Sequence, residues 1–157
     1  MKKHSKSYYD AIWRGKLSEM SKADSYSLFK PNIGLEKYTW AVKNYRHRNS
    51  LARLRLSAHK LMIEIGRHHK VPLERSERKC PSCLNCIEDE CHFLITCPLY
   101  ENEREILFTE VRLICRSFDE IPTDKQKFVY LMTQEDNGLL ARLAAFVFKA
   151  SKLREDY

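Results

Sequence analysis

Five of the six cysteines of this 157-residue chain fall between positions 80 and 97, and this cluster constrains the fold more than any other feature. Cys80 and Cys83 form a C-x2-C pair, His92 follows after eight residues and Cys97 after four more. Thiolate sulfur and imidazole nitrogen are preferred ligands of Zn²⁺, and four of them in a tetrahedron close a structural site. The spacing therefore predicts one structural zinc ion held by Cys80, Cys83, His92 and Cys97.

The ligand set has alternatives. Cys83 and Cys86 also form a C-x2-C pair, and Cys91 offers a thiol directly before His92. We favour Cys80 with Cys83, because the longer spacing leaves room for a helical turn that delivers His92. In this interpretation Cys86 and Cys91 are ordinary thiols. Four protein ligands leave no open position for a catalytic water, which argues against a zinc hydrolase.

Helical periodicity dominates the rest of the chain. Glycine (4) and proline (5) are scarce, and apolar residues recur at helical spacing. The clearest apolar stripe runs from Ser50 to Ile65. Asn49 or Ser50 can cap its start, and Gly66 can end it in the left-handed conformation. Further helical stretches are expected at 8–22, at 35–45, after Pro98, after Thr123 and from Leu139 onward.

These patterns predict a mainly α fold, in which a helical domain carries a small CCHC zinc knuckle inserted between helices at 79–100. Hydrophobic residues make up 43% of the chain, which is enough for one core. Pro31 and Gly34 interrupt helical continuation. Residues 1–35 are therefore expected to form an N-terminal helical extension, and residues 36–157 the helical domain.

Positive charge is concentrated in the middle of the chain. The whole chain has a net charge of +7, but residues 41–80 carry about +8 and residues 81–157 about −5. A segment more basic than the whole chain indicates a polyanionic partner, of which nucleic acid is the commonest. Contacts with its phosphate backbone give affinity without sequence choice. The side chains predicted to make them are Arg46, Arg48, Arg53, Arg55, Lys60, Arg67 and Lys70.

No segment of the sequence indicates secretion or a membrane partner. Met1–Lys6 leads into polar sequence without an apolar signal core. The most apolar stretch, Leu139–Ala150, is too short to cross a bilayer and is interrupted by Arg142. Cysteines in such a chain are expected to be thiols or metal ligands rather than disulfides. We therefore expect an intracellular protein.

Four motifs around the cysteine cluster carry a family likeness: RLRLSAHKL at 53–61, IEIGR at 63–67, ERKCPSC at 77–83 and EDECHFLITCPLY at 88–100. Together they resemble the C-terminal region of reverse transcriptases from animal non-LTR (LINE-like) retrotransposons, which often ends in a C-x2-C…H-x4-C knuckle. The likeness extends more loosely over most of the chain. It implies a zinc-binding, nucleic-acid-handling element beside a polymerase domain, in the nucleus.

The catalytic motifs of that family are not found in these residues. Reverse transcription requires paired aspartates that hold two metal ions, and Tyr8-Tyr9-Asp10-Ala11 lacks the second aspartate. The sequence also shows no clustered carboxylates with a nearby lysine, as an endonuclease would need. We therefore predict a non-catalytic module that positions template RNA or target DNA for the parent polymerase. The alternatives are a zinc-stapled structural or protein-interaction domain, and a decayed transposon-derived fragment without selected function.

Overall fold

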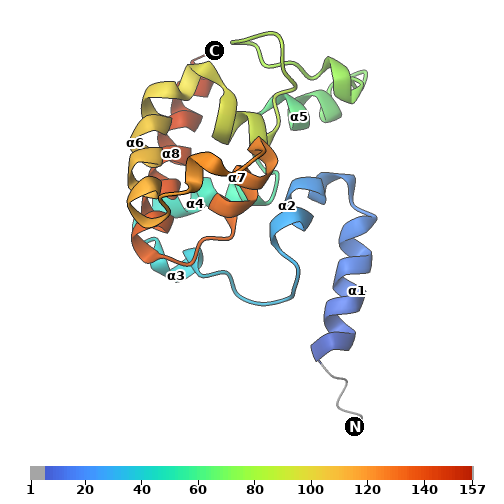
Figure 1. The fold of residues 1–157 in the computed structure, drawn as a ribbon. Coiled ribbons are helices and arrows are strands. Elements are labelled where there is room, and N and C mark those ends of the chain that lie inside the picture. Colours follow the sequence, from blue (N-terminus) through green and yellow to red (C-terminus); the bar gives the residue numbers. More distant parts are fainter. Residues whose placement is uncertain (1–5, 157) are drawn as a thin grey trace.

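The computed structural model describes residues 6–156, apart from the side chain of Ser21, and over this range every regular element is a helix (Figure 1). The predicted mainly α fold is thus confirmed, while residues 1–5 of the predicted extension lie outside the described residues. The longer helices are α1 (Lys6–Ser18), α4 (Tyr45–Arg55), α6 (Glu101–Ile114), α7 (Asp124–Met132) and α8 (Asn137–Glu155). The shorter α-helices are α2 (Asp24–Phe29), α3 (Tyr38–Ala41) and α5 (Met62–Ile65), and η4 (His92–Thr96) is a π-helix. The 3-10 turns are Ser21–Ala23, Gly66–His68, Arg75–Glu77, Pro98–Tyr100 and Phe118–Glu120.

Helix α8 is the central element of the core. Helices α4 and α6 pack along it, and Figure 1 shows α6 and α8 side by side. The helix begins after Asp136, whose carboxylate accepts a hydrogen bond from the N–H of Leu139 (2.8 Å). Each large apolar side chain buried here contributes about 1.5–3 kcal/mol. The buried residues of α8 are Leu139, Leu140, Leu143, Ala144, Phe146, Val147 and Ala150.

The N-terminal helices join this body through aromatic rings. Phe29 of α2 packs edge-on against Phe128 of α7, with ring centroids 5.9 Å apart. Trp13 of α1 packs in the same way on Tyr26 of α2 (6.2 Å), and Figure 1 shows α1 projecting away from the other helices. A domain boundary at residue 35 stays a prediction. Within residues 6–156 no helix combines the length and hydrophobicity needed to cross a bilayer.

The single helix predicted for Ser50–Ile65 is wrong. Helix α4 begins earlier, because the side chain of Asn44, and not Asn49 or Ser50, accepts hydrogen bonds from the N–H groups of Arg46 (3.0 Å) and His47 (3.2 Å). It ends at Arg55, and the chain resumes a helix only at α5. Gly66 has φ −65°, so it does not end a helix in the left-handed conformation as expected.

Helix α4 ends at this point because of a contact with a distant segment. Ser57 adopts φ 49°, and its buried hydroxyl donates a hydrogen bond to the Glu90 carboxylate (2.7 Å). At this turn the helical hydrogen bonds of α4 end, and the buried hydrogen bond from Ser57 connects the chain to the cysteine-rich segment. The predicted apolar stripe is split by it, so that Leu51, Leu54 and Leu61 are buried while Ala58 and Ile65 are exposed. Local periodicity contains no information about such a partner.

Arg55, expected on an exposed basic face, is instead buried, so that expectation is wrong. Its side chain is ion-paired with Glu36 and donates a hydrogen bond to the carbonyl of Met132 (2.7 Å). The guanidinium also lies over the ring of Phe29, 4.4 Å from the centroid. Arg55 therefore fastens α4 to the loop before α3 and to the end of α7.

Replacing Arg55 with Ala should destabilise the protein by about 3–5 kcal/mol, because it leaves the Glu36 carboxylate buried without a counter-charge. Urea unfolding followed by circular dichroism measures this. The control is Arg142→Ala, which removes an exposed ion pair to Glu110 and should cost less than about 1 kcal/mol. An equal decrease in the free energy of unfolding in the two variants would show that the buried ion pair of Arg55 stabilises the fold no more than an exposed one.

Candidate functional site

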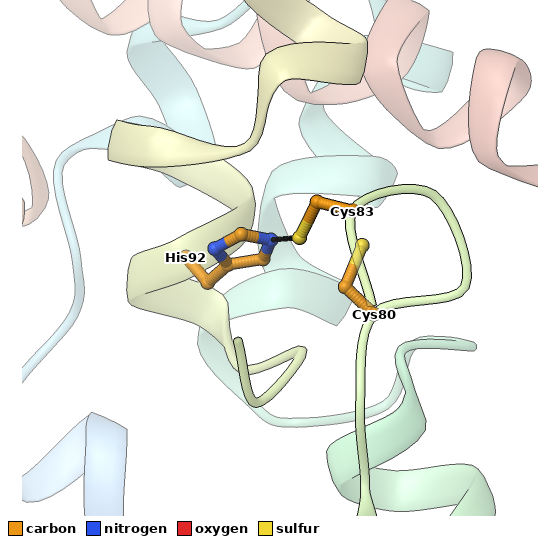
Figure 2. Close-up of side chains that lie close together, drawn as sticks. All are labelled: Cys80, Cys83 and His92. Carbon is orange, nitrogen blue, oxygen red and sulfur yellow. Dashed lines mark hydrogen bonds between the residues drawn. The ribbon is translucent and has the colours of Figure 1, made fainter. Parts of the chain in front are cut away.

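Cys80 and Cys83 lie on a tight loop that turns back on itself. Its ends are joined by a bridge between Lys79 and Ile87, and the N–H of Cys80 donates to the carbonyl of Cys86 (2.9 Å). Inside the loop, the N–H of Leu84 donates to the carbonyl of Cys80 (2.8 Å), with Leu84 itself at φ 61°. The turn places both sulfurs on the side that faces His92 (Figure 2).

His92 comes from the π-helix η4, whose start is fixed by Asp89. The Asp89 carboxylate accepts a hydrogen bond from the N–H of His92 (2.9 Å). The N–H of Cys97 then donates to the carbonyl of His92 (2.9 Å), which is the i to i+5 bond of a π-turn. This wide turn brings residue i+5 back to the side of residue i. It is the local reason why an H-x4-C spacing suits a shared ligand site.

The structure brings three of the four predicted ligands together. One ligand atom from each of Cys80, Cys83 and His92 lies within 4.8 Å of the others, which is close enough to hold a metal ion. The Cys83 Sγ is 3.5 Å from His92 Nε2 (Figure 2). Cys97 lies outside this group of three, but its Sγ is 3.8 Å from the Cys80 Sγ.

Two of the six separations among the four side chains match edges of a zinc tetrahedron. With Zn–S near 2.3 Å and Zn–N near 2.0–2.1 Å, the edge is about 3.8 Å between two sulfurs and about 3.5 Å between sulfur and nitrogen. The observed edges, from Cys80 to Cys97 and from Cys83 to His92, have these lengths. Cys97 does not lie within 4.8 Å of all three other ligand atoms, so a four-ligand tetrahedron would require its side chain to move closer to them.

The protonation of the three cysteines follows from burial and from backbone hydrogen bonds. Burial raises the pKa of Cys80 and raises that of Cys97 to about 12, so without a cation both are thiols. For Cys83 burial acts in the same direction, but hydrogen bonds from the backbone N–H groups of Cys86 and Asn85 outweigh it and lower the pKa. A metal ion bound here must displace protons from sulfur.

The surroundings of His92 favour its neutral form, which is the form that binds a metal ion. Burial lowers its pKa, which favours the uncharged imidazole at neutral pH. Its Nδ1 lies 3.0 Å from the hydroxyl oxygen of Thr96. With the proton on Nδ1 and donated to Thr96, the lone pair of Nε2 is directed to the cysteine sulfurs. A hydrogen bond of this kind fixes the tautomer and orientation of a ligating imidazole.

The other thiols take no part in this cluster. Cys86 is exposed, and Cys91 is half-buried with a pKa raised to about 12 by burial. Neither belongs to the group formed by Cys80, Cys83 and His92. Cys115 follows the end of α6, far along the chain. The choice between the two C-x2-C registers stays a prediction, and the cluster favours the register that begins at Cys80.

Two arginines flank the cluster, Arg104 buried and Arg154 half-buried. Arg104 of α6 donates hydrogen bonds to the carbonyls of Leu94 (3.0 Å) and Cys97, so it fixes the end of η4. On the other side, Arg154 of α8 grips the Glu88 carboxylate with two hydrogen bonds of 2.5 and 3.1 Å. Three thiolates and one Zn²⁺ would carry a net charge of −1. The positively charged Arg104 lies beside Cys97, the fourth predicted ligand.

A basic groove of about 610 Å³ lies next to this cluster, between α4, the segment 59–65 and the end of α8. Its floor is apolar and its rim is cationic. Three of the predicted phosphate-binding residues line it, namely Arg46, Arg53 and Lys60. Sequence reasoning missed two more basic residues of the rim, Lys152 and Arg154. Basic residues in the last turn of a helix are common, so the sequence held no distinctive signal for them.

The remaining predicted phosphate contacts lie away from the lining of the groove. Arg48 donates to the carbonyl of Val42 (2.7 Å), and Arg67 is ion-paired with Glu64 (3.3 Å). Lys70 is exposed in the loop after the Gly66–His68 turn, and Arg55 is buried as described above. The structure thus gathers only part of the predicted basic surface into one place.

Comparisons of the chain with family models, with curated proteins and with solved structures found no match.

Replacing Thr96 with Val should lower metal affinity roughly 10- to 100-fold, because the His92 imidazole loses the acceptor that orients it. Competition against a chromophoric chelator measures this. Thr109→Val is the matched control, since its exposed hydroxyl donates only to the Glu105 carbonyl (2.9 Å). If both variants keep the parent affinity, Thr96 has no part in ligand orientation.

Proposed function

We propose that this chain is a zinc-stapled, non-catalytic nucleic-acid-binding module of the kind found at the C-terminus of LINE-like reverse transcriptases. The observation that carries the proposal is the groove beside the Cys/His cluster, on which side chains from α4, from the segment 59–65 and from α8 converge. Of its charged lining, only Glu155 is acidic; the basic residues are Arg46, Arg53, Lys60, Lys152 and Arg154. Such a site suits a polyanion.

Zinc is the ion that the donor set favours. Three thiolates and one imidazole are soft or borderline ligands, which select zinc over magnesium or calcium. All four positions of a tetrahedron would be filled by Cys80, Cys83, His92 and Cys97, so the ion would have a structural role. Its binding free energy would be folding free energy for the segment 79–100.

A polymerase or nuclease activity is not part of this proposal. Asp10, the aspartate nearest to a polymerase-like motif, is buried and accepts a hydrogen bond from the N–H of Ile33 (2.8 Å). This contact gives it a structural role between α1 and the loop that follows α2. The module would instead hold template RNA or target DNA for a parent polymerase domain in the nucleus, through contacts with the phosphate backbone.

The second candidate is a zinc-stapled domain that binds protein rather than nucleic acid. It is favoured by ion pairs that neutralise part of the basic surface from within, such as Lys60 with Glu155 (3.5 Å) and Arg67 with Glu64 (3.3 Å). The two candidates differ in their response to salt, because only phosphate contacts release condensed counterions.

Purified protein dialysed against metal-free buffer should retain about one zinc ion per chain, as four closed ligands hold it tightly. Elemental mass spectrometry measures this. Cys80→Ser and Cys83→Ser should lose the ion and destabilise the fold, whereas Cys86→Ser and Cys115→Ser should keep it. The opposite result for Cys86 and Cys80 would establish the other register.

The double variant Arg46→Glu/Arg53→Glu should bind nucleic acid at least about tenfold more weakly at low salt, because two cations of the rim are reversed. Fluorescence anisotropy at several salt concentrations measures affinity and salt slope, and the slope should fall by about 1 for each phosphate that the variant no longer binds. Arg116→Glu, at an exposed position outside the groove lining, is the control. Unchanged affinity in the double variant would remove the groove from the proposal.

A further inference from the structure

We infer that the groove accepts an unpaired base, so that the module prefers single-stranded over double-stranded nucleic acid. This inference rests on the proposed nucleic-acid-binding function and adds to it the class of substrate. Two features of the groove lead to it: an apolar, partly aromatic floor and a ring of cations above that floor. A surface that met only the phosphates of a duplex would need the second feature but not the first.

The floor is formed by side chains that offer no charge to a phosphate. Leu54, Leu61 and Phe93 are almost fully buried beneath it, and Phe148 is half-buried at one side. Phe148 is held by His47, whose ring centroid lies 5.0 Å away. Apolar walls with few polar groups are typical of sites that enclose a flat organic ring. Polar groups for the edges of a base are supplied by Asn49, Ser50 and Ser151.

Tyr45 supplies a stacking surface at the groove. It is the first residue of α4, and 68% of its surface is exposed, which is unusual for an aromatic ring that lines a cavity. The guanidinium of Arg48 lies 5.9 Å from its ring centroid. Base–aromatic stacking of this kind is tolerant of sequence and is common in proteins that bind single strands.

The size of the groove also favours an unpaired base. Its volume of about 610 Å³ lies within the roughly 300–1,000 Å³ of small-ligand sites. Bases in a duplex are paired and stacked, so placing one in the groove would first require its extrusion, which has a free-energy cost. A single strand has no such cost, and its phosphates can remain at the rim beside Arg53, Lys60 and Lys152.

One acidic side chain occupies the rim where a phosphate would lie. Glu155 is ion-paired with both Lys60 (3.5 Å) and Lys152 (3.7 Å). A bound phosphate would compete with this carboxylate for the same two ammonium groups. Removing the charge of Glu155 should therefore strengthen binding, which is the opposite of what removal of a structural ion pair would do.

The test uses the full, zinc-loaded chain and fluorescein-labelled 12-mers of dT and of U, together with a 12-base-pair duplex of mixed sequence. At constant salt we expect both single strands to bind at least about tenfold more tightly than the duplex. The dT and U probes differ in the sugar and in the C5-methyl group of the base, so a 12-mer of dU is included. The ratio of dU to U then separates DNA from RNA as the source of the strand.

Four variants test the groove itself. Tyr45→Ala should weaken single-strand binding roughly fivefold or more, and Tyr45→Phe should retain it, because only the ring is needed. Lys152→Ala should weaken binding and lower the salt slope, while Glu155→Gln should strengthen binding. The matched control is Lys149→Ala, since Lys149 lies one turn earlier on α8, pairs with Glu103 (2.9 Å) and does not line the groove.

The possible outcomes are distinct. Equal affinity for single strands and duplex, with Tyr45→Ala and Lys152→Ala indistinguishable from Lys149→Ala, would overturn the inference and leave the proposed function standing. No binding to any of the probes by a zinc-loaded, folded protein would overturn both. Zinc content and circular dichroism of each variant show whether a loss comes from the groove or from misfolding. A 2-aminopurine probe, quenched on stacking by the parent protein but not by Tyr45→Ala, would support the base slot directly.

Discussion

Two buried carboxylates hold the cysteine-rich segment in the fold, and the candidate metal centre depends on them. Glu88 binds Arg154 of α8 and accepts a hydrogen bond from the N–H of Met62 (2.7 Å). Glu90 accepts hydrogen bonds from the hydroxyl groups of Ser25 (2.8 Å) and Ser57 (2.7 Å) and contacts the His59 ring (2.9 Å). Burial alone would raise the pKa of Glu90, but these partners, His59 first, lower it to about 2. The carboxylate is therefore ionised and fully engaged at neutral pH.

This arrangement couples the metal centre to the groove. His92 and Phe93 are neighbours in η4, and while one lies in the cluster, the other forms part of the groove floor. Arg154 likewise lines the groove while it grips Glu88 beside the cysteines. If a metal ion is bound, its loss would release the cysteine loop, while η4 would still be held by Arg104 and by the buried carboxylates. We therefore expect metal binding to set the shape of the groove rather than to contact the ligand.

The features that depend on local pattern could be predicted from the sequence. The features that depend on contacts between residues far apart in the chain could not. The helical class follows from periodicity, and the cysteine and histidine spacing identified side chains that do lie together. The helix expected over Ser50–Ile65 was wrong because Glu90, far along the chain, captures the hydroxyl of Ser57. Arg55 resembles its neighbour Arg53 in sequence, but only the fold shows that Glu36 and Phe29 enclose it. Lys152 could not be assigned to the groove until α8 was seen to pack along α4.

The metal centre and the rim of the groove differ in charge, and in the proposed function they have different roles. A zinc ion with three thiolates would leave the centre with a net charge of −1, so the centre itself would not attract a polyanion. In the proposed function the attraction would come from the rim of the groove, where Lys60 and Lys152 are ion-paired with Glu155. These ion pairs are exposed, so a phosphate that displaces the Glu155 carboxylate from the two ammonium groups would lose no more than about 1 kcal/mol for each pair. A phosphate that arrives with a stacked base has both charge and apolar contact, and this combination distinguishes a nucleic-acid strand from a simple anion.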